Sequence, residues 1–585
     1  MRKVYVGILL GLWLGNMEAQ SFVWAKKGGL WAYDYGYGIT TDNSGNVYVA
    51  GKYEQNANFS GTVLPCQGNH DIFLAQYSSS GNLNWIRTAG GYTGDYATSV
   101  ACDGNYVYVA GEIEGKNATI KFVGSPITLQ CNNSNDIFLA KYTLSGTLLW
   151  ARRAGSPYYE KALGITYDYA GNVYICGLFN NSATFGGTTT ISGYGKNDIF
   201  VAKYDASGNF LWVRKAGSAG RDEAKSIKCD AAGNVYICGL YKDGCVFGSQ
   251  TLSSPNGYFN AFVAKYSPGG SLLWVKKGGG NYDDVGWSLT LDNAGMVYVA
   301  GEFNATATFS GKTLYTSGSA DAMVLCYDAS GNIQWAKKAG GNAVDRARGI
   351  GFAGNKLYIT GQFGNTAAFG SMYKTAADNS DIFIACMSTS GSFLWVSAAG
   401  GAKDAYEELG YESGNAVCAD AAGNVYATGS MLNGATFGST SLSPYTRTDV
   451  FVTKLRSSSV EREPSDSTGT DSISREQELY GMLPGTAETT VPEEMVAADG
   501  RSEAAVTGFR VYPNPGTGIF SLELDLGATE MIELSVFNSS GQVVDYRSLA
   551  YAPLLQVDLS GREKGIYFIE IKTGEAVLKK KIVLQ

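Results

Sequence analysis

GNVYVAG at residues 45–51 and DIFLAQY at residues 71–77 decide the fold, because each stretch has seven related copies along the chain. Copies of the first stretch stand at 104–111, 171–177, 233–239, 295–301, 354–361 and 423–429. Copies of the second stand at 136–142, 198–204, 260–266, 321–327, 381–387 and 449–455. Both stretches are short, rich in Val, Ile, Phe and Tyr, and bounded by Gly, Asn, Asp or Ser, which is typical of strands between tight turns.

A tryptophan follows each of the first six strand pairs, and one more stands before the first pair. Seven such tryptophans lie 60 to 65 residues apart: Trp24, Trp85, Trp150, Trp212, Trp274, Trp335 and Trp395. A period this regular indicates a repeat fold. One full period reads as four antiparallel strands, at 225–230, 235–241, 260–266 and 271–277, with a long loop between the second and the third.

A four-stranded sheet repeated seven times predicts an all-β, seven-bladed β-propeller, in which the ring protects the sheet edges. The strand around Trp24 begins the array without a unit of its own, and the strand at 449–455 ends it without a fourth partner. We therefore expect residues 21–27 to complete the last unit and close the ring. The alternative, an open solenoid, has no reason to leave complementary partial units at its ends.

Outside residues 21–456, which we assign to the propeller, the composition changes at both ends. Residues 1–20 read as a secretory signal peptide, with Arg2 and Lys3 before an apolar run and small Ala19 near the cleavage point. No later stretch offers about 20 consecutive apolar residues, so we expect no transmembrane segment in the mature protein. Residues 457–506 are acidic and contain many Ser, Thr and Pro residues, which predicts a flexible linker.

Charge and cysteine content narrow the classes of partner. The net charge of -8 and the pI near 5.1 give no basic footprint for nucleic acid. Cys176 and Cys238 occupy a slot that takes alanine in other units, and Cys326 and Cys386 share another repeat position, so we expect these four to be small core residues. Cys66 and Cys131, each five residues before a strand of the DIF type, are the one pair to test for a disulfide, since their distance cannot be read from the sequence.

Residues 507–585 show the alternation of a small antiparallel β-sandwich. Their motifs resemble the C-terminal sorting domain of type IX secretion substrates, on these residues: Tyr512, Pro513, Asn514, Pro515, Gly518, Gly565, Ile566, Tyr567, Lys581, Ile582 and Val583. The resemblance implies passage through the periplasm, recognition by the type IX secretion machinery, and release or attachment at the outer-membrane cell surface. It also implies a bacterium of the Bacteroidetes group.

The seven units resemble the bacterial β-propeller repeat family typified by GNVYVxG and DIFVAKYD. Membership of that family implies a fold and an exported protein. It implies little about a ligand, because one fold hosts many functions.

Few residues offer catalytic or metal-binding chemistry. The chain has a single histidine, His70, which argues against histidine triads and histidine metal sites, and we expect it to be a solvated loop residue. The turns DASGN and DAAGN lack the alternating acids of a calcium loop and read as structural turns. The sequence therefore predicts no catalytic residue, no metal site and no cofactor.

An acid recurs ten residues after six of the seven tryptophans, in the loop that leads from one unit to the next. These acids are Asp34, Asp95, Glu160, Asp222, Asp284 and Asp345; the seventh loop contains Asp404, Glu407 and Glu408 in an insertion. A ring of carboxylates could bind cations or basic groups. The repetition favours the other interpretation, in which each acid accepts backbone N–H bonds that fix its loop.

Aromatic residues in the same loops break the symmetry, and asymmetry points to a ligand. The candidate ligand-binding residues are Trp31, Tyr33, Tyr92, Tyr158, Tyr159 and Tyr406, with Asp34, Asp95 and Glu160 beside them. Planar rings near carboxylates suit sugar faces or peptide segments. The alternative is that these rings pack between units.

These observations favour a secreted or surface-displayed binding or adhesion module for a glycan or a protein, without enzymatic activity. One alternative is an extracellular carboxylate-based glycan hydrolase or lyase, which needs two carboxyls about 5 to 10 Å apart in one pocket. Another alternative is a purely structural surface protein.

Overall fold

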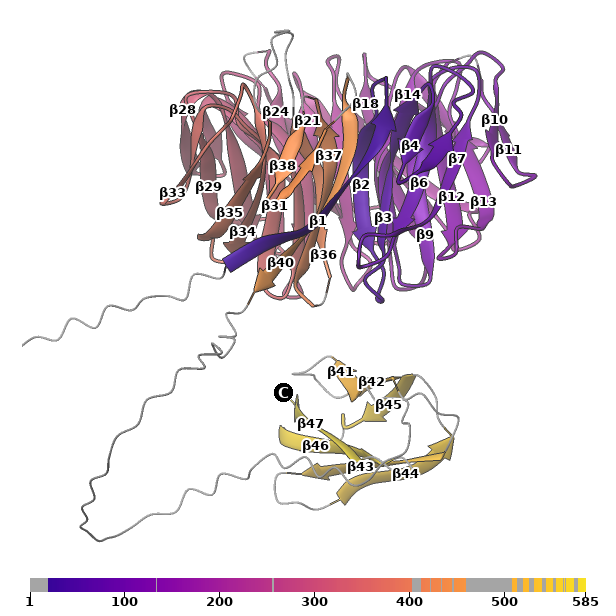
Figure 1. Cartoon of the computed structure of the whole chain (residues 1–585), viewed down its shortest axis with the longest axis vertical. Coiled ribbons are helices and arrows are strands. Elements are labelled where there is room, and N and C mark those ends of the chain that lie inside the picture. The colour runs from indigo at the N-terminus through magenta and orange to yellow at the C-terminus, as the bar shows by residue number, and fades with distance from the viewer. Residues whose placement is uncertain are drawn as a thin grey trace, which may run out of the picture. The chain divides into compact units, whose positions relative to one another are not determined.

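The computed structural model describes residues 19–458 and 508–584 except for short segments in both ranges. The segments left out are 133, 255–256, 402–411, 421, 433, 444–446, 513–518, 526–530, 539–542, 551–553, 561, 563 and 573–576. The chain forms two compact units, Met1–Asp466 and Ser467–Gln585. All regular elements among the described residues are β-strands (Figure 1), and no helix of these residues could span a membrane.

In the first compact unit, each repeat is an antiparallel sheet of four neighbouring strands, and we call one such repeat a unit. In the first repeat these strands are β2 (Tyr35–Thr41), β3 (Val47–Glu54), β6 (His70–Tyr77) and β7 (Leu83–Gly90). β3 is buried on both faces over seven of its eight residues, because adjacent sheets pack against each side of it. This burial explains why GNVYVAG is an almost continuous apolar run rather than an alternating one.

The same order recurs around the ring. The next sheets are β8 (Tyr96–Cys102), β9 (Tyr106–Ile113), β12 (Asp136–Thr143), β13 (Leu148–Ala154), then β14 (Glu160–Tyr167), β15 (Val173–Phe179), β18 (Asp198–Tyr204), β19 (Phe210–Gly217). They continue with β20 (Glu223–Cys229), β21 (Val235–Tyr241), β24 (Asn260–Tyr266), β25 (Leu272–Gly280), then β26 (Val285–Leu291), β27 (Val297–Phe309), β28 (Lys312–Tyr327), β29 (Ile333–Gly341), then β30 (Arg346–Ala353), β31 (Lys356–Phe363), β34 (Asp381–Ser388), β35 (Phe393–Ala399).

The last sheet closes the ring with the two ends of the repeat region. β36 (Ser413–Ala419), β37 (Asn424–Met431) and β40 (Asp449–Ser458) are joined by β1 (Ala19–Leu30), which pairs with β40 from Gly28↔Val450 to Ala19↔Ser458. β2 packs between β8 and β36, so the first and last sheets are neighbours. The expected completion of the last unit by the N-terminal strand is confirmed.

The connection between the second and third strands of a repeat contains a short β-hairpin, whereas the sequence predicted only a long loop. In the first unit it holds a hairpin of β4 (Ala57–Phe59) and β5 (Thr62–Leu64), and β4 pairs with β1, the outer strand of the preceding sheet. Separate hairpin strands in other repeats are β10 (Thr119–Phe122), β11 (Thr128–Gln130), β16 (Ser182–Phe185), β17 (Thr189–Ser192), β22 (Cys245–Phe247), β23 (Gln250–Leu252), β32 (Thr366–Phe369), β33 (Met372–Thr375), β38 (Ala435–Phe437) and β39 (Thr440–Leu442). In the fifth repeat the end of β27 and the start of β28 form the hairpin. Each first strand ends in a buried phenylalanine, such as Phe59, that anchors the hairpin.

The repeated tryptophans tie each sheet to the next. The indole N–H of Trp150 donates to the carbonyl of Ala206 at 3.3 Å, in the tight turn of the following unit. Gly208 of that turn has φ +78°, and a Cβ there would lie 2.9 Å from the Trp150 ring. Glycine is thus required both by the backbone and by the close approach of the ring.

The acids of the tight turns serve the backbone. Asp42 accepts N–H bonds from Ser44 and Asn46, both at 2.9 Å, and the hydroxyl of Tyr48 donates to it at 2.9 Å. These bonds support the structural interpretation of the turns. Cys66 and Cys131, the pair to test for a disulfide, are both free thiols in this structure.

The second compact unit is a small β domain of two antiparallel sheets. One contains β41 (Gly508–Tyr512), β42 (Ile519–Asp525) and β45 (Leu554–Asp558); the other contains β44 (Val543–Ala550), β43 (Met531–Asn538), β46 (Gly565–Lys572) and β47 (Val577–Leu584). Both contribute to one core, which includes Leu522, Val536 and Ile582.

The sorting-signal residues divide between described and undescribed parts of this domain. Tyr512 ends β41, Gly565 and Tyr567 lie in β46, and Lys581, Ile582 and Val583 lie in β47. Tyr567 and Ile582 are buried in its core. Pro513, Asn514, Pro515 and Gly518 lie outside the described residues.

Candidate functional site

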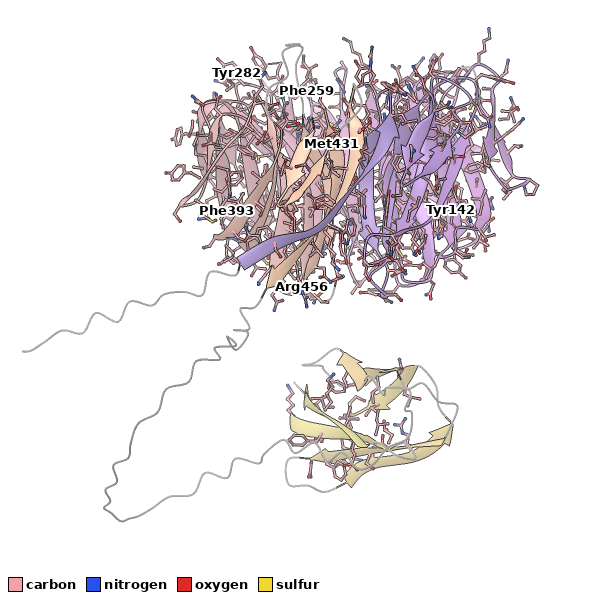
Figure 2. All side chains as sticks on the ribbon, in the orientation of Figure 1. Tyr142, Phe259, Tyr282, Phe393, Met431 and Arg456 are labelled. Carbon is pink, nitrogen blue, oxygen red and sulfur yellow. The ribbon has the colours of Figure 1, made fainter. Side chains whose placement is uncertain are left out.

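The loops between units and the ends of the long connections share one face of the propeller, which we call the loop face. Figure 2 shows Tyr282 and Phe259 at one edge of the ring and Arg456, near the end of β40, at the opposite edge. Isolated bridges such as His70↔Gly94 join the end of a long connection to the following inter-unit loop. The other edge carries the tight turns.

The repeated acids of the loop face are buried anchors. Asp95 accepts backbone N–H bonds from Gly91 at 2.8 Å and from Glu114 at 3.0 Å, which fixes the inter-unit loop onto the second strand of its sheet. The acids at this position are all at most 1% exposed: Asp34, Asp95, Glu160, Asp222, Asp284 and Asp345. As direct ligand contacts, Asp34, Asp95 and Glu160 were therefore wrongly assigned, because no surface of these side chains reaches solvent.

Burial dominates the electrostatics of these carboxyls. Desolvation raises the pKa of Asp34 to about 8, against backbone N–H bonds that lower it and the charge of Asp449 that raises it further. Desolvation also raises the pKa of Glu160 to about 8 and that of Asp95 to about 7. Such groups hold protons near neutral pH and fit a structural role better than a salt bridge to a ligand.

In the seventh loop the equivalent acid is Glu412, directly before β36 and 1% exposed, rather than one from the insertion. Asp404, Glu407, Glu408 and Tyr406 lie outside the described residues. Carboxylate oxygens of Glu412, Asp378 and Asp381 lie within 4.8 Å of one another, so this group has the spacing of cation ligands. Desolvation raises the pKa of Asp381 to about 6, so this carboxyl takes up a proton at a higher pH than an exposed aspartate.

The predicted aromatic residues lie on the loop face with large exposed fractions. Trp31 is 57% exposed, Tyr92 89% and Tyr158 44%. Tyr33 is 38% exposed, and the Arg447 guanidinium lies over its ring, 4.7 Å from the ring centre. These values leave the rings accessible, and their contact with a ligand stays a prediction.

Tyr159 differs from its neighbour Tyr158, because it is half-buried. Burial raises the pKa of its hydroxyl, and a hydrogen bond with Glu112 raises it further. This ring belongs to the packed wall beneath the loops.

A network of polar side chains connects the first three repeats beneath the aromatic residues. Glu54 bonds to Lys52 and to His70 Nδ1, both at 3.1 Å, and Tyr96 Oη lies 2.5 Å from His70 Nε2. The backbone N–H of Tyr33 donates to the same Glu54 at 3.4 Å, which links the polar network to the aromatic loop. In the third unit Lys161 bonds to Glu112 at 2.7 Å and lies 5.0 Å from the Tyr96 ring centre.

His70 is therefore not a solvated loop residue, as the sequence suggested. It begins β6, is half-buried, and bonds on both ring nitrogens. Burial lowers the pKa of His70, the nearby Lys52 charge lowers it further, and Glu54 opposes both. The ring is thus favoured in its neutral form, in which one nitrogen donates and the other accepts.

The sequence did not predict this network of polar side chains, because its members occupy positions that differ from repeat to repeat. Glu54, at the end of the first GNVYVAG-type strand, is matched by Glu114 in the second unit but by Asn180 and Lys242 in the next two. Departures from the repeat consensus at the ends of strands were the available signal.

Comparison with known proteins identifies parts of both compact units. Residues 510–585 match the family described as "Secretion system C-terminal sorting domain", and residues 28–52 match the family described as "Beta-propeller repeat". The sorting domain indicates secretion or export to the cell surface. The predicted resemblances are confirmed.

Two curated proteins match parts of this chain at low sequence identity. An uncharacterised WD repeat-containing protein of Acanthamoeba polyphaga mimivirus is 24% identical over 59% of this chain, and the regulatory protein FlaEY of Caulobacter vibrioides is 26% identical over 28% of it. The matches span only 30% and 18% of those two proteins. Among solved structures, the quinohemoprotein alcohol dehydrogenase from Comamonas testosteroni is 9% identical, with a TM-score of 0.32, over 75% of this chain and 77% of that one. That likeness carries no argument about this chain.

Proposed function

Because the chain carries a β-propeller repeat and a secretion system sorting domain, we propose that it is an exported binding protein that holds a glycan or protein ligand on its loop face. The contact sector consists of Trp31, Tyr92 and Tyr158 in three successive inter-unit loops. The main support is that all three rings are exposed in successive inter-unit loops, up to 89% for Tyr92. Exposed aromatic rings stack on sugar faces and on peptide segments.

The loops that carry these rings are held rigidly, which suits recognition. Asp34, Asp95 and Glu160 each fix one of the three loops through hydrogen bonds from backbone N–H groups. A preorganised loop loses little conformational entropy when it binds. The acids thus support the sector indirectly.

The same acids weigh against a carboxylate-based hydrolase or lyase. Such an enzyme needs two carboxyls that reach the scissile bond, with one of them ionised as a base or nucleophile. Asp34, Asp95 and Glu160 are buried and have raised pKa values, so they present neither a surface nor a stable charge.

The test is a glycan array and a panel of extracellular proteins probed with the full secreted chain. Once a ligand is found, Trp31→Ala, Tyr92→Ala and Tyr158→Ala should each weaken binding several-fold, since one stacking contact is worth on the order of 1 kcal/mol. Their thermal unfolding should stay unchanged. Tyr169→Ala is the matched control, because Tyr169 is 86% exposed but lies in a tight turn on the opposite face.

A triple alanine variant that binds as well as the parent chain would remove the sector from the site. If the full chain binds no glycan on the array and no protein of the panel, the result favours the purely structural alternative.

A further inference from the structure

One β-bulge in the inner strand of every sheet turns a side chain toward the axis of the ring. In β2 the pairing with β3 skips Tyr37, between Gly36 and Gly38. The skipped residues around the ring are Tyr37, Thr98, Leu163, Lys225, Trp287, Arg348 and Asn415. They differ in every sheet, although the strands around them repeat. A bulge commonly re-aims a side chain for a purpose other than pairing.

These seven residues line a cavity of about 140 Å³ on the axis, walled by the inner strands of all seven sheets. At about 30 Å³ for each water molecule, it has room for a few waters or one small ion. Its lining includes the cations Lys225, Lys228 and Arg348. None of the described residues that line it is Asp or Glu.

Two of the cations flank a tryptophan. Lys225 Nζ lies 4.9 Å from the Trp287 ring centre, and the Arg348 guanidinium carbon lies 5.1 Å from it. Lys225 bonds to the buried Glu223, which Arg221 also contacts. Among the described residues, the hydrogen bonds of Arg348 go to the neutral amide oxygen of Gln362, at 3.4 Å, and the charge of Glu302 partly offsets that of the guanidinium.

Lys228 is the third cation and lines a second cavity as well. The group whose charge would oppose it is the thiol of Cys418, but burial raises the pKa of that thiol far above its usual range and keeps it neutral. Desolvation lowers the pKa values of the partly buried Lys225 and Arg348, whereas Lys228 keeps an exposed surface. A bound anion would reverse this penalty.

Neutral donors complete the wall. The Ser226 hydroxyl oxygen accepts the backbone N–H of Leu289 at 3.2 Å, and that of Ser288 accepts the N–H of Ile350 at 3.4 Å. Each hydroxyl hydrogen can then turn toward the cavity. Cations and hydroxyl donors without a lining carboxylate are the chemistry that recognises an oxyanion.

We propose that the axial cavity is a binding site for one small oxyanion, held by Lys225, Lys228 and Arg348. The class comprises inorganic phosphate, sulfate and the carboxylate of a small acid. The site is separate from the aromatic sector of the loop face, and it does not depend on the proposed glycan or protein ligand.

The experiment is calorimetric titration of the full chain with sodium phosphate, sodium sulfate or sodium acetate, with sodium chloride keeping the ionic strength constant. We expect one site per chain and a raised melting temperature with the anion that fits. Preference for phosphate or sulfate over acetate would identify a tetrahedral anion, and the reverse order would identify a carboxylate.

Variants separate this site from the general effect of charge. Arg348→Gln and Lys228→Gln should each weaken binding at least about tenfold, since each removes a charge-assisted hydrogen bond. Lys312→Gln removes the same charge from the exposed start of β28 and should bind like the parent. If Arg348→Gln does not fold, Lys228→Gln carries the comparison. Tyr92→Ala should keep its affinity for the anion, which distinguishes this proposal from the proposed ligand site.

Absence of saturable binding by all three anions would overturn the proposal. Equal affinity in Lys228→Gln, Lys312→Gln and the parent would also overturn it, because binding would then lie elsewhere.

Discussion

At the scale of residues, the ring is held together by an indole that rests on a glycine. Six tryptophans lie over a glycine of the next unit, where a Cβ would come within about 3 Å of the ring: Gly81, Gly146, Gly208, Gly270, Gly331 and Gly391. The last tryptophan, Trp395, has no such turn beside it, because β40 and β1 are the two ends of the repeat region. Its buried indole N–H has no acceptor among the described residues.

Replacing one of these glycines tests the contact separately from backbone strain. Gly208→Ala should destabilise the propeller by about 1 kcal/mol for the left-handed backbone and by a further 1 to 3 kcal/mol for overpacking against Trp150. Gly124→Ala is the control, because Gly124 has φ +82° and nothing within 4 Å of its Cβ position. Chemical denaturation should show a larger loss for Gly208→Ala; equal losses would mean that the Trp150 contact contributes little.

At the scale of elements, closure depends on β1, which comes from the opposite end of the repeat region. β1 pairs with β40 on one edge and with the hairpin strand β4 on the other. It therefore bridges the last sheet and the first, and no covalent turn supports it on either side. Ring closure rests on hydrogen bonds and packing alone.

Deleting residues 21–27 should expose β40 and lower the melting temperature by more than about 10 °C, because most of the pairing between β1 and β40 is lost. Differential scanning calorimetry on the full chain measures this. Deleting 470–476, which removes seven residues from the acidic stretch after the propeller, should leave the transition unchanged. An unshifted transition in the 21–27 deletion would contradict closure by β1.

The sequence was sufficient for the repeated strands and for the exchange at the ends, because both leave periodic signals. It was insufficient for the hairpins such as β4–β5, whose strands of three residues are too short to show a period. A phenylalanine followed by glycine within two residues recurs in the long connections, as at Phe59 and Phe185, and was the signal that could have revealed them. The Glu54–His70–Tyr96 network depends on contacts between two sheets, which no single repeat encodes.

At the scale of the whole molecule, a propeller and a sorting domain are joined by a stretch with the composition of a linker. Residues 510–585 match the secretion sorting domain, which indicates that this part directs export of the chain. Removing residues 507–585 in a host with type IX secretion should trap the propeller in the periplasm. Protease accessibility on intact cells, with a periplasmic marker as control, measures the outcome; undiminished surface exposure would contradict it.

The exit point of the chain has a mechanical consequence. β40 begins at Asp449 beside the loop face and ends at Ser458 near the opposite edge, where the start of β1 lies against it. If a ligand is gripped on the loop face while the tail is anchored, tension runs along β40. That strand is flanked on both sides, by β37 and by β1, so the load falls in shear on two ladders of hydrogen bonds at once. Shear must break many bonds together, whereas peeling breaks them singly, so a pull along β40 meets more resistance than a pull across it.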